Sequence, residues 1–174
     1  MIDDKSVAQI LTLAEELEIE VWLDGGWGVD ALLGRQTRDH ADLDLVLRTR
    51  DIPILERALL TIGFHEVSRG SPANFVLSDD HERQIDIHGI EFDDRGFGCF
   101  LLPDGRVWPM PPSAFAGSGV VAGKPARCLS EQAQVQCHGQ GYEPTETDLQ
   151  DMENLQERFQ VVLPLPLCRQ KPIA

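Results

Sequence analysis

The spacing of apolar residues divides the chain into helices and strands. Segments with apolar side chains three and four positions apart, which is the spacing of one helix face, are residues 7–17, 29–33, 54–62, 133–135 and 149–159. Segments with the alternation or β-branched content of strands are residues 19–23, 42–47, 64–67, 74–77 and 84–92. Helices and strands in this mixed order predict the α+β class.

Signals at the ends of these segments support the division. Ser6 is placed to cap the first helix, and Pro53 suits the first turn of the third. Thr145 and Asp148 have the spacing of a capping box at the start of the last helix. Residues 93–127 are rich in glycine and proline, which predicts loops with short strands.

A chain of 174 residues suits one domain with a small appendage and can bury a core. Its hydrophobic content of 42% is too high for a disordered chain. We expect three parts: a main domain over residues 1–125, a C-terminal helical segment packed on it over 126–163, and an extended or mobile proline-rich tail over 164–174.

The charge balance limits the classes of partner. The chain has 15 Lys and Arg against 29 Asp and Glu, a formal net charge of −14. Nucleic acids and anionic membranes are normally bound through basic patches, so neither is expected as a partner. The acidity favours cationic partners, or phosphates that arrive with metal ions.

Compartment signals favour the cytoplasm. No basic segment followed by an apolar run begins the sequence, so we expect no signal peptide. The longest uncharged stretch, residues 107–123, is interrupted by prolines and glycines and cannot form a membrane helix. The four cysteines are widely spaced, which favours reduced thiols over a zinc site or a disulfide framework.

Asp42 and Asp44 are the most informative polar residues. Side chains two apart in a strand point to the same face, so these carboxylates repel each other unless a cation lies between them. Hard oxygen ligands of this kind suit Mg²⁺ together with substrate phosphates. The alternative is an exposed polar face of an edge strand.

Asp86 and His88 repeat this spacing on another predicted strand. If the two strands are neighbours in the sheet, Asp86 completes a triad of carboxylates with Asp42 and Asp44. Such a triad is what a two-metal phosphoryl or nucleotidyl transfer site requires. His88 is either a partner of the carboxylates or a surface histidine.

Gly25 and Gly26 form a turn between a predicted strand and a short helix. Glycines allow backbone N–H groups to approach a phosphate, and a helix N-terminus favours its negative charge. The spacing matches neither the dinucleotide-binding motif nor the P-loop. The alternative is an ordinary tight turn.

These features together resemble the nucleotidyltransferase superfamily that includes DNA polymerase β. Within it, the chain is similar to the small lincosamide nucleotidyltransferases and, more loosely, to the aminoglycoside nucleotidyltransferases. The similar blocks are residues 22–30 (WLDGGWGVD), 37–44 (TRDHADLD), 85–88 (IDIH) and 138–148. The resemblance covers roughly residues 5–160 and leaves the proline-rich tail outside.

The resemblance implies a nucleotidyltransferase fold, with a mixed sheet flanked by helices and a cleft over the carboxylates. It implies that Asp42 and Asp44 bind Mg²⁺. Asp86 would take the proton from the attacking hydroxyl and could also contact one metal ion. The turn formed by Gly25, Gly26 and Trp27 would hold the β- and γ-phosphates of ATP. Many relatives have a serine where this chain has Trp27, so backbone N–H groups or arginines must replace its hydroxyl.

Further residues are candidates for the nucleotide or the acceptor. Arg35 and Arg38 precede the metal strand and have the guanidinium groups that suit phosphate oxygens, although solvated loop charges are the alternative. Lys124 follows a glycine-rich stretch and could reach the triphosphate. Asp30 and Tyr142 lie in blocks that match the family, and we expect them near the metal ligands or the substrate.

The resemblance predicts a cytoplasmic enzyme that uses two Mg²⁺ ions to transfer AMP from ATP to a lincosamide hydroxyl, which confers resistance. The alternatives are an aminoglycoside or another small-molecule or protein acceptor. A non-enzymatic alternative is an acidic metal- or nucleotide-binding regulator or interaction module. The residues leave open which antibiotic, hydroxyl and nucleotide are used, and whether a homodimer forms.

Overall fold

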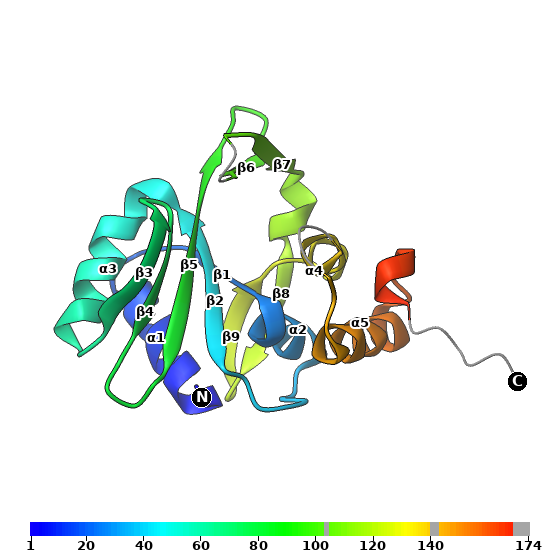
Figure 1. Cartoon of the computed structure of the whole chain (residues 1–174), viewed down its shortest axis with the longest axis horizontal. Coiled ribbons are helices and arrows are strands. Elements are labelled where there is room, and N and C mark those ends of the chain that lie inside the picture. Colours follow the sequence, from blue (N-terminus) through cyan, green and yellow to red (C-terminus); the bar gives the residue numbers. More distant parts are fainter. Residues whose placement is uncertain (103–104, 140–142, 169–174) are drawn as a thin grey trace, which may run out of the picture.

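A single twisted sheet organises the chain in the computed structural model, which describes residues 1–102, 105–139 and 143–168. Nine strands in this part of the chain form the sheet, in the order β3-β4-β5-β2-β1-β9-β8, with β6 and β7 extending from β5 (Figure 1). The strands are β1 (Val21–Asp24), β2 (Asp42–Arg48), β3 (His65–Ser71), β4 (Asn74–Ser78), β5 (Gln84–Phe92), β6 (Gly98–Leu101), β7 (Val107–Met110), β8 (Gly117–Val121) and β9 (Lys124–Cys128).

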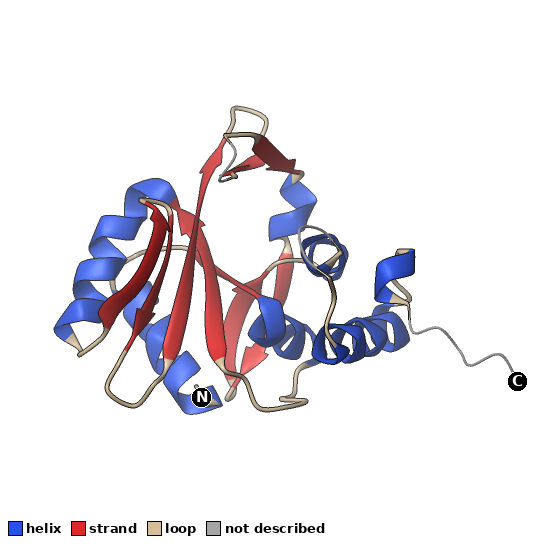
Figure 2. Cartoon of the chain, in the orientation of Figure 1, coloured by secondary structure: helices blue, strands red, loops and turns tan. Residues whose placement is uncertain are grey.

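Helices flank the sheet, as Figure 2 shows. The α-helices are α1 (Asp4–Glu16), α2 (Gly25–Leu33), α3 (Ile52–Thr61), α4 (Glu131–His138) and α5 (Glu146–Phe159), and the 3-10 helices are η1 (Thr49–Asp51), η2 (Pro112–Phe115) and η3 (Leu165–Leu167). The pairing of β2 with β5 is parallel and that of β1 with β2 is antiparallel, so the sheet is mixed as predicted. Among the described residues, no helix has the length and apolar character needed to cross a membrane.

The alternation of side chains assigns each sheet face its environment. Leu43, Leu45 and Leu47 of β2 are fully buried in one core with apolar residues of α1 and α3. The opposite face is covered at one end by a second apolar cluster around Trp22 and Val46. At the other end it carries carboxylates, so the strand alternation predicted from the sequence separates core from site.

The predicted caps were partly right. Thr145 and Asp148 form the expected capping box at the start of α5. Ser6 was wrong as the first cap, because Asp3 occupies the N-cap of α1 and its carboxylate accepts from the Ser6 backbone N–H at 2.8 Å. Ser6 itself is buried inside the first turns.

Over residues 93–127, the described part of the chain has short strands, β6 to β9, joined by loops and turns, in agreement with the expected loops with short strands. Their glycines are required by close packing as well as by turns: a Cβ on Gly119 of β8 would lie 1.8 Å from the carbonyl oxygen of Ala31 in α2. Composition alone does not separate a glycine that permits close contact from one that makes a turn.

The structure describes the C-terminal part as far as residue 168. The expected boundary at residue 125 falls within β9, which pairs with β1 and β8. At the start of the predicted extended tail, residues 165–167 form η3, and Leu167 is fully buried against α5 and α2 residues. Burial of Leu167 fixes this turn, which follows Pro164 and contains Pro166.

Candidate active site

Three carboxylates form a row across neighbouring strands. In the parallel pair of β2 and β5, Asp44 lies opposite Asp86. In the antiparallel pair of β1 and β2, Asp24 lies opposite Asp44. Directly opposite residues share a sheet face, and Asp42 joins this face two positions before Asp44. The expectation that the two aspartate-bearing strands are neighbours is confirmed.

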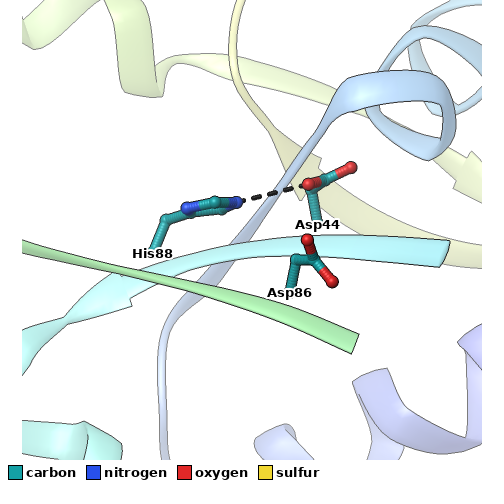
Figure 3. Close-up of side chains that lie close together, drawn as sticks. All are labelled: Asp44, Asp86 and His88. Carbon is teal, nitrogen blue, oxygen red and sulfur yellow. Dashed lines mark hydrogen bonds and ion pairs between the residues drawn. The ribbon is translucent and has the colours of Figure 1, made fainter. Parts of the chain in front are cut away.

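Asp44, Asp86 and His88 lie close together, as Figure 3 shows. One ligand atom from each lies within 4.8 Å of the others. The ring Nε2 of His88 is 3.2 Å from Asp44 Oδ1, so this histidine is a partner of the carboxylates rather than a distant surface residue. The donor set of carboxylate oxygens suits a hard divalent cation.

The proximity of like charges raises the pKa of these acids. Burial and the charges of Asp44 and Asp42 raise the pKa of Asp86 to about 6. Burial and the charge of Asp44 likewise raise the pKa of Asp42 and of Asp24. Carboxylates held together at such a cost are typical of a site that a cation completes.

Gly25 brings the start of α2 against this row. The helix begins at Gly25 itself, so the glycine pair is its first turn rather than a break before it. Asp24 is the N-cap, and its carboxylate accepts from Gly25 N–H at 2.8 Å. Gly25 has φ +57°, and a Cβ there would lie 2.3 Å from Asp44 Oδ2. Only glycine allows the helix N-terminus to come this close.

A cleft of about 290 Å³ opens over the carboxylates and the helix N-terminus. Its lining residues are Asp24, Gly25, Gly26, Arg38, Asp42, Asp44, Cys137, His138 and Asp148. The cleft therefore combines carboxylates that can hold metal ions with a helix end that can hold phosphate oxygens. This combination supports group transfer from a nucleotide.

Comparison with known proteins agrees with this geometry. The family described as Aminoglycoside-2''-adenylyltransferase matches residues 6–155, which is most of the chain. The chain belongs to this family of nucleotidyltransferases.

Two sequence relatives are named for different classes of antibiotic. The lincosamide resistance protein of Staphylococcus haemolyticus is 32% identical over 154 residues, which cover 88% of this chain and 94% of that protein. A 2''-aminoglycoside nucleotidyltransferase of Klebsiella pneumoniae is 32% identical over 127 residues, which cover 73% of this chain and 67% of that protein.

A solved structure has the same fold over nearly the same length. The crystal structure of the lincosamide antibiotic adenylyltransferase LnuA with lincomycin bound superposes with a TM-score of 0.80 at 32% identity. The match covers 89% of this chain and 97% of that one. The nucleotidyltransferase fold predicted from the sequence is confirmed.

The two predicted arginines separate in the adenylyltransferase fold. Arg38 lines the cleft, and its Nη2 contacts Asp151 Oδ2 of α5 at 2.7 Å. Arg35 borders a different hollow, beside Gly34 and Val120. The structure thus brings Arg38 to the carboxylates and does not bring Arg35 there.

Trp27 and Asp30 support the cleft from behind. The Trp27 side chain is 2% exposed and packs on the His40 ring, with 4.5 Å between centroids. Asp30 is also buried, contacts His40 Nε2 at 2.5 Å and accepts from the Thr37 hydroxyl at 2.6 Å. Neither side chain lines the cleft. Their contacts with Thr37 and His40 instead hold the loop that leads into β2.

Lys124 and Tyr142 do not contribute to the cleft as described. Lys124 starts β9, four residues before Cys128, which pairs with Leu23 of β1. Its Nζ lies 2.6 Å from Glu15 Oε2, beside a separate hollow of about 420 Å³. The structure therefore does not bring Lys124 to the carboxylates. Tyr142 lies outside the described residues.

Sequence reasoning assigned no role to three residues that line the cleft: Asp24, Cys137 and His138. Asp24 had a signal, since it ends a predicted strand directly before the glycine pair. The others had none in their spacing, because only packing brings α4 and α5 over the sheet. Burial and nearby Asp24 raise the pKa of the Cys137 thiol well above its usual value, so the thiol stays protonated.

Proposed function

We propose that this protein is a Mg²⁺-dependent enzyme that transfers AMP from ATP to a hydroxyl of a lincosamide antibiotic. The observation that carries the proposal is the likeness to lincosamide adenylyltransferases along nearly the whole chain. The row of carboxylates at the N-terminus of α2 supplies the chemistry that such a transfer requires.

The carboxylates fit the metal ions that the reaction requires. Asp42, Asp44 and Asp86 would hold Mg²⁺, since their mutual repulsion is relieved by a divalent cation. Bound Mg²⁺ would acidify the acceptor hydroxyl and neutralise charge on the departing pyrophosphate. His88 Nε2–H donates to Asp44 Oδ1 at 3.2 Å and thereby fixes the orientation of that carboxylate.

Asp86 is the proposed general base. It receives the proton when the acceptor oxygen attacks the α-phosphorus of ATP and the bond to pyrophosphate breaks. Even without metal ions its pKa is raised only to about 6, so the Asp86 carboxylate is mostly ionised at neutral pH and can accept a proton. The first N–H groups of α2 and the Arg38 guanidinium would hold the phosphates.

The acceptor is proposed to be a cationic antibiotic. Lincosamides carry an amine, and a protein with a net charge of −14 attracts such a molecule. An aminoglycoside is the second candidate, because the matching family and the Klebsiella pneumoniae relative carry that name. The lincosamide is preferred because that likeness covers 88% of the chain against 73%.

Mass spectrometry of antibiotics incubated with the protein, ATP and Mg²⁺ tests the proposal. We expect lincomycin and clindamycin to gain one AMP, and kanamycin to remain unchanged. A gain on kanamycin alone would move the protein to the aminoglycoside acceptors. If none gains AMP and no pyrophosphate forms with cell extract added, the protein is a binding module and the proposal fails.

The setting of the reaction is part of the proposal. A transferase that consumes ATP works where ATP is made, so we place it in the cytoplasm. Two-metal use and a homodimer are proposed with it. Metal titration and light scattering of the purified protein test these two statements.

A further inference from the structure

Two side chains that can carry positive charge line the cleft among the described residues, Arg38 and His138. Each is paired with a carboxylate of α5: Arg38 with Asp151, and His138 with Asp148. Asp148 and Asp151 are three residues apart, so they lie on one face of the helix. One face of α5 therefore holds the Arg38 guanidinium and the His138 imidazole against the cleft.

His138 is held in one orientation. It is 7% exposed, and its Nδ1 lies 2.8 Å from the backbone carbonyl oxygen of Gln134. A carbonyl can only accept, so Nδ1 carries the hydrogen. Nε2 lies 3.7 Å from Asp148 Oδ1, which is too long for a hydrogen bond, so this nitrogen can donate to a ligand in the cleft when the ring carries both hydrogens. The ring is thus aligned, with Nε2 toward the cleft residue Asp148.

Arg38 is aligned next to the helix N-terminus. Its Nε and Nη2 contact the Asp151 carboxylate, which is 1% exposed, and its Nη1 donates to the Asp39 carbonyl at 3.1 Å. A guanidinium has five N–H groups, so these contacts leave two. The position of a Cβ on Gly26 lies 2.5 Å from Arg38 Nη2, which places the guanidinium beside the first turn of α2.

Structural stability alone is a weak reason for these pairs. Burying an ion pair contributes little net stability, because desolvation offsets the attraction. A nucleoside triphosphate is strongly anionic, however, and this chain has a net charge of −14. Such a cleft requires fixed donors opposite its own carboxylates to retain the phosphates.

We infer that His138 contacts the triphosphate of the bound nucleotide together with Arg38, and that Asp148 and Asp151 of α5 position these two groups. This inference rests on the proposed function and adds residues to it. It assigns α4 and α5 to the nucleotide, in addition to their packing role. Asp148 and Asp151 are positioning residues, since each acts through its partner.

Binding of an ATP analogue with a methylene group between the α- and β-phosphorus atoms, in Mg²⁺, tests the inference without turnover. We expect His138→Gln to weaken binding about tenfold, the effect of losing one charge-assisted hydrogen bond. The affinity of His138→Gln for inorganic pyrophosphate, which has phosphates but no nucleoside, should fall by a similar factor. In turnover, KM for ATP should rise while KM for the acceptor stays unchanged.

Asp148→Asn is the second variant. An asparagine keeps an acceptor for the Thr145 N–H and so retains the helix cap, but it removes the charge that faces His138. We expect Asp148→Asn to weaken the binding of the analogue and of pyrophosphate by a smaller factor than His138→Gln does. His65→Gln, an exposed histidine on β3, is the matched control and should bind both ligands like the wild type.

Three outcomes would overturn the inference. Wild-type affinity of both variants for the analogue would exclude a phosphate contact. Weaker analogue binding with unchanged pyrophosphate binding would move His138 to another part of the nucleotide. An equal rise in KM for ATP and for the acceptor, with a lowered Tm, would show that His138 only contributes to packing. If the wild type binds no nucleotide at all, the proposed function itself fails.

Discussion

Asp86 shows at the scale of one residue how function and stability oppose each other. Asp44 lies opposite it on β2, and burial together with the charges of Asp44 and Asp42 raises its pKa to about 6. An acid whose pKa is higher in the folded state than its usual value of about 3.9 destabilises the fold once it is ionised. As the pH rises, this destabilisation develops between about pH 4 and pH 6, and it is fully present at higher pH.

Asp86→Asn should therefore stabilise the protein and inactivate it. In a chelator at pH 8, we expect the Tm to rise by roughly 2–6 °C, from about 1–2 kcal/mol, because the side chain keeps some contact with water. The difference should shrink at pH 5, where the wild-type group is protonated. Calorimetry at both pH values measures it.

Asp94→Asn, which alters an exposed carboxylate, is the control for Asp86→Asn and should leave the Tm within a degree or so of wild type. Addition of Mg²⁺ should then raise the Tm of the wild type more than that of Asp86→Asn. An unchanged or lowered Tm of Asp86→Asn in chelator would contradict the electrostatic account of the site.

At the scale of the element, α2 has a left-handed glycine at each end, with different consequences. Gly25 has φ +57° and lies against Asp44, whereas Gly34 has φ +70° and no atom within 4 Å of its Cβ position. The backbone strain of an alanine is similar at both positions. Only Gly25 adds a steric conflict with a proposed metal ligand.

Gly25→Ala and Gly34→Ala separate strain from function. We expect Gly34→Ala to lose about 1–2 kcal/mol of unfolding free energy and to keep its AMP-transfer rate. Gly25→Ala should lose at least as much stability and about 100-fold in rate, because it displaces the Asp44 carboxylate. Denaturant unfolding and pyrophosphate release measure both. Equal rates in the two variants would contradict the role of Gly25.

At the scale of the whole molecule, the cleft depends on α2 packing closely on the far strands of the sheet. Gly119 of β8 allows this contact, since its Cβ would lie 1.8 Å from the Ala31 carbonyl. The same helix contacts α4 and α5, which complete the cleft from the other side. A change at this distant contact therefore affects the whole cleft.

Gly119→Ala should lose about 3 kcal/mol of unfolding free energy, the upper range for overpacking, because the conflict is with backbone. Gly123→Ala is the control: Gly123 has φ +79° and open space, so only the strain of about 1–2 kcal/mol is expected. Urea unfolding of both variants measures the difference. A smaller loss in Gly119→Ala than in Gly123→Ala would show that α2 shifts freely.

Local patterns determined much of the site. Alternation along a strand depends only on the geometry of the chain, so the shared face of Asp42 and Asp44, and that of Asp86 and His88, could be predicted without a fold. The capping box of α5 is local for the same reason. The choice of Asp3 over Ser6 as the first cap was missed because both suit that position and burial decided between them.

Only the tertiary structure decided which distant residues meet. Arg35 and Arg38 are equivalent in sequence, but one of them finds the buried Asp151, 113 positions away. Lys124, at the start of β9, pairs with Glu15 of α1, and His138 reaches the cleft because α4 packs on α2. The sequence by itself sets the spacing of side chains along each element. Contacts across elements follow from how the apolar faces of those elements bury one another, which spacing does not encode.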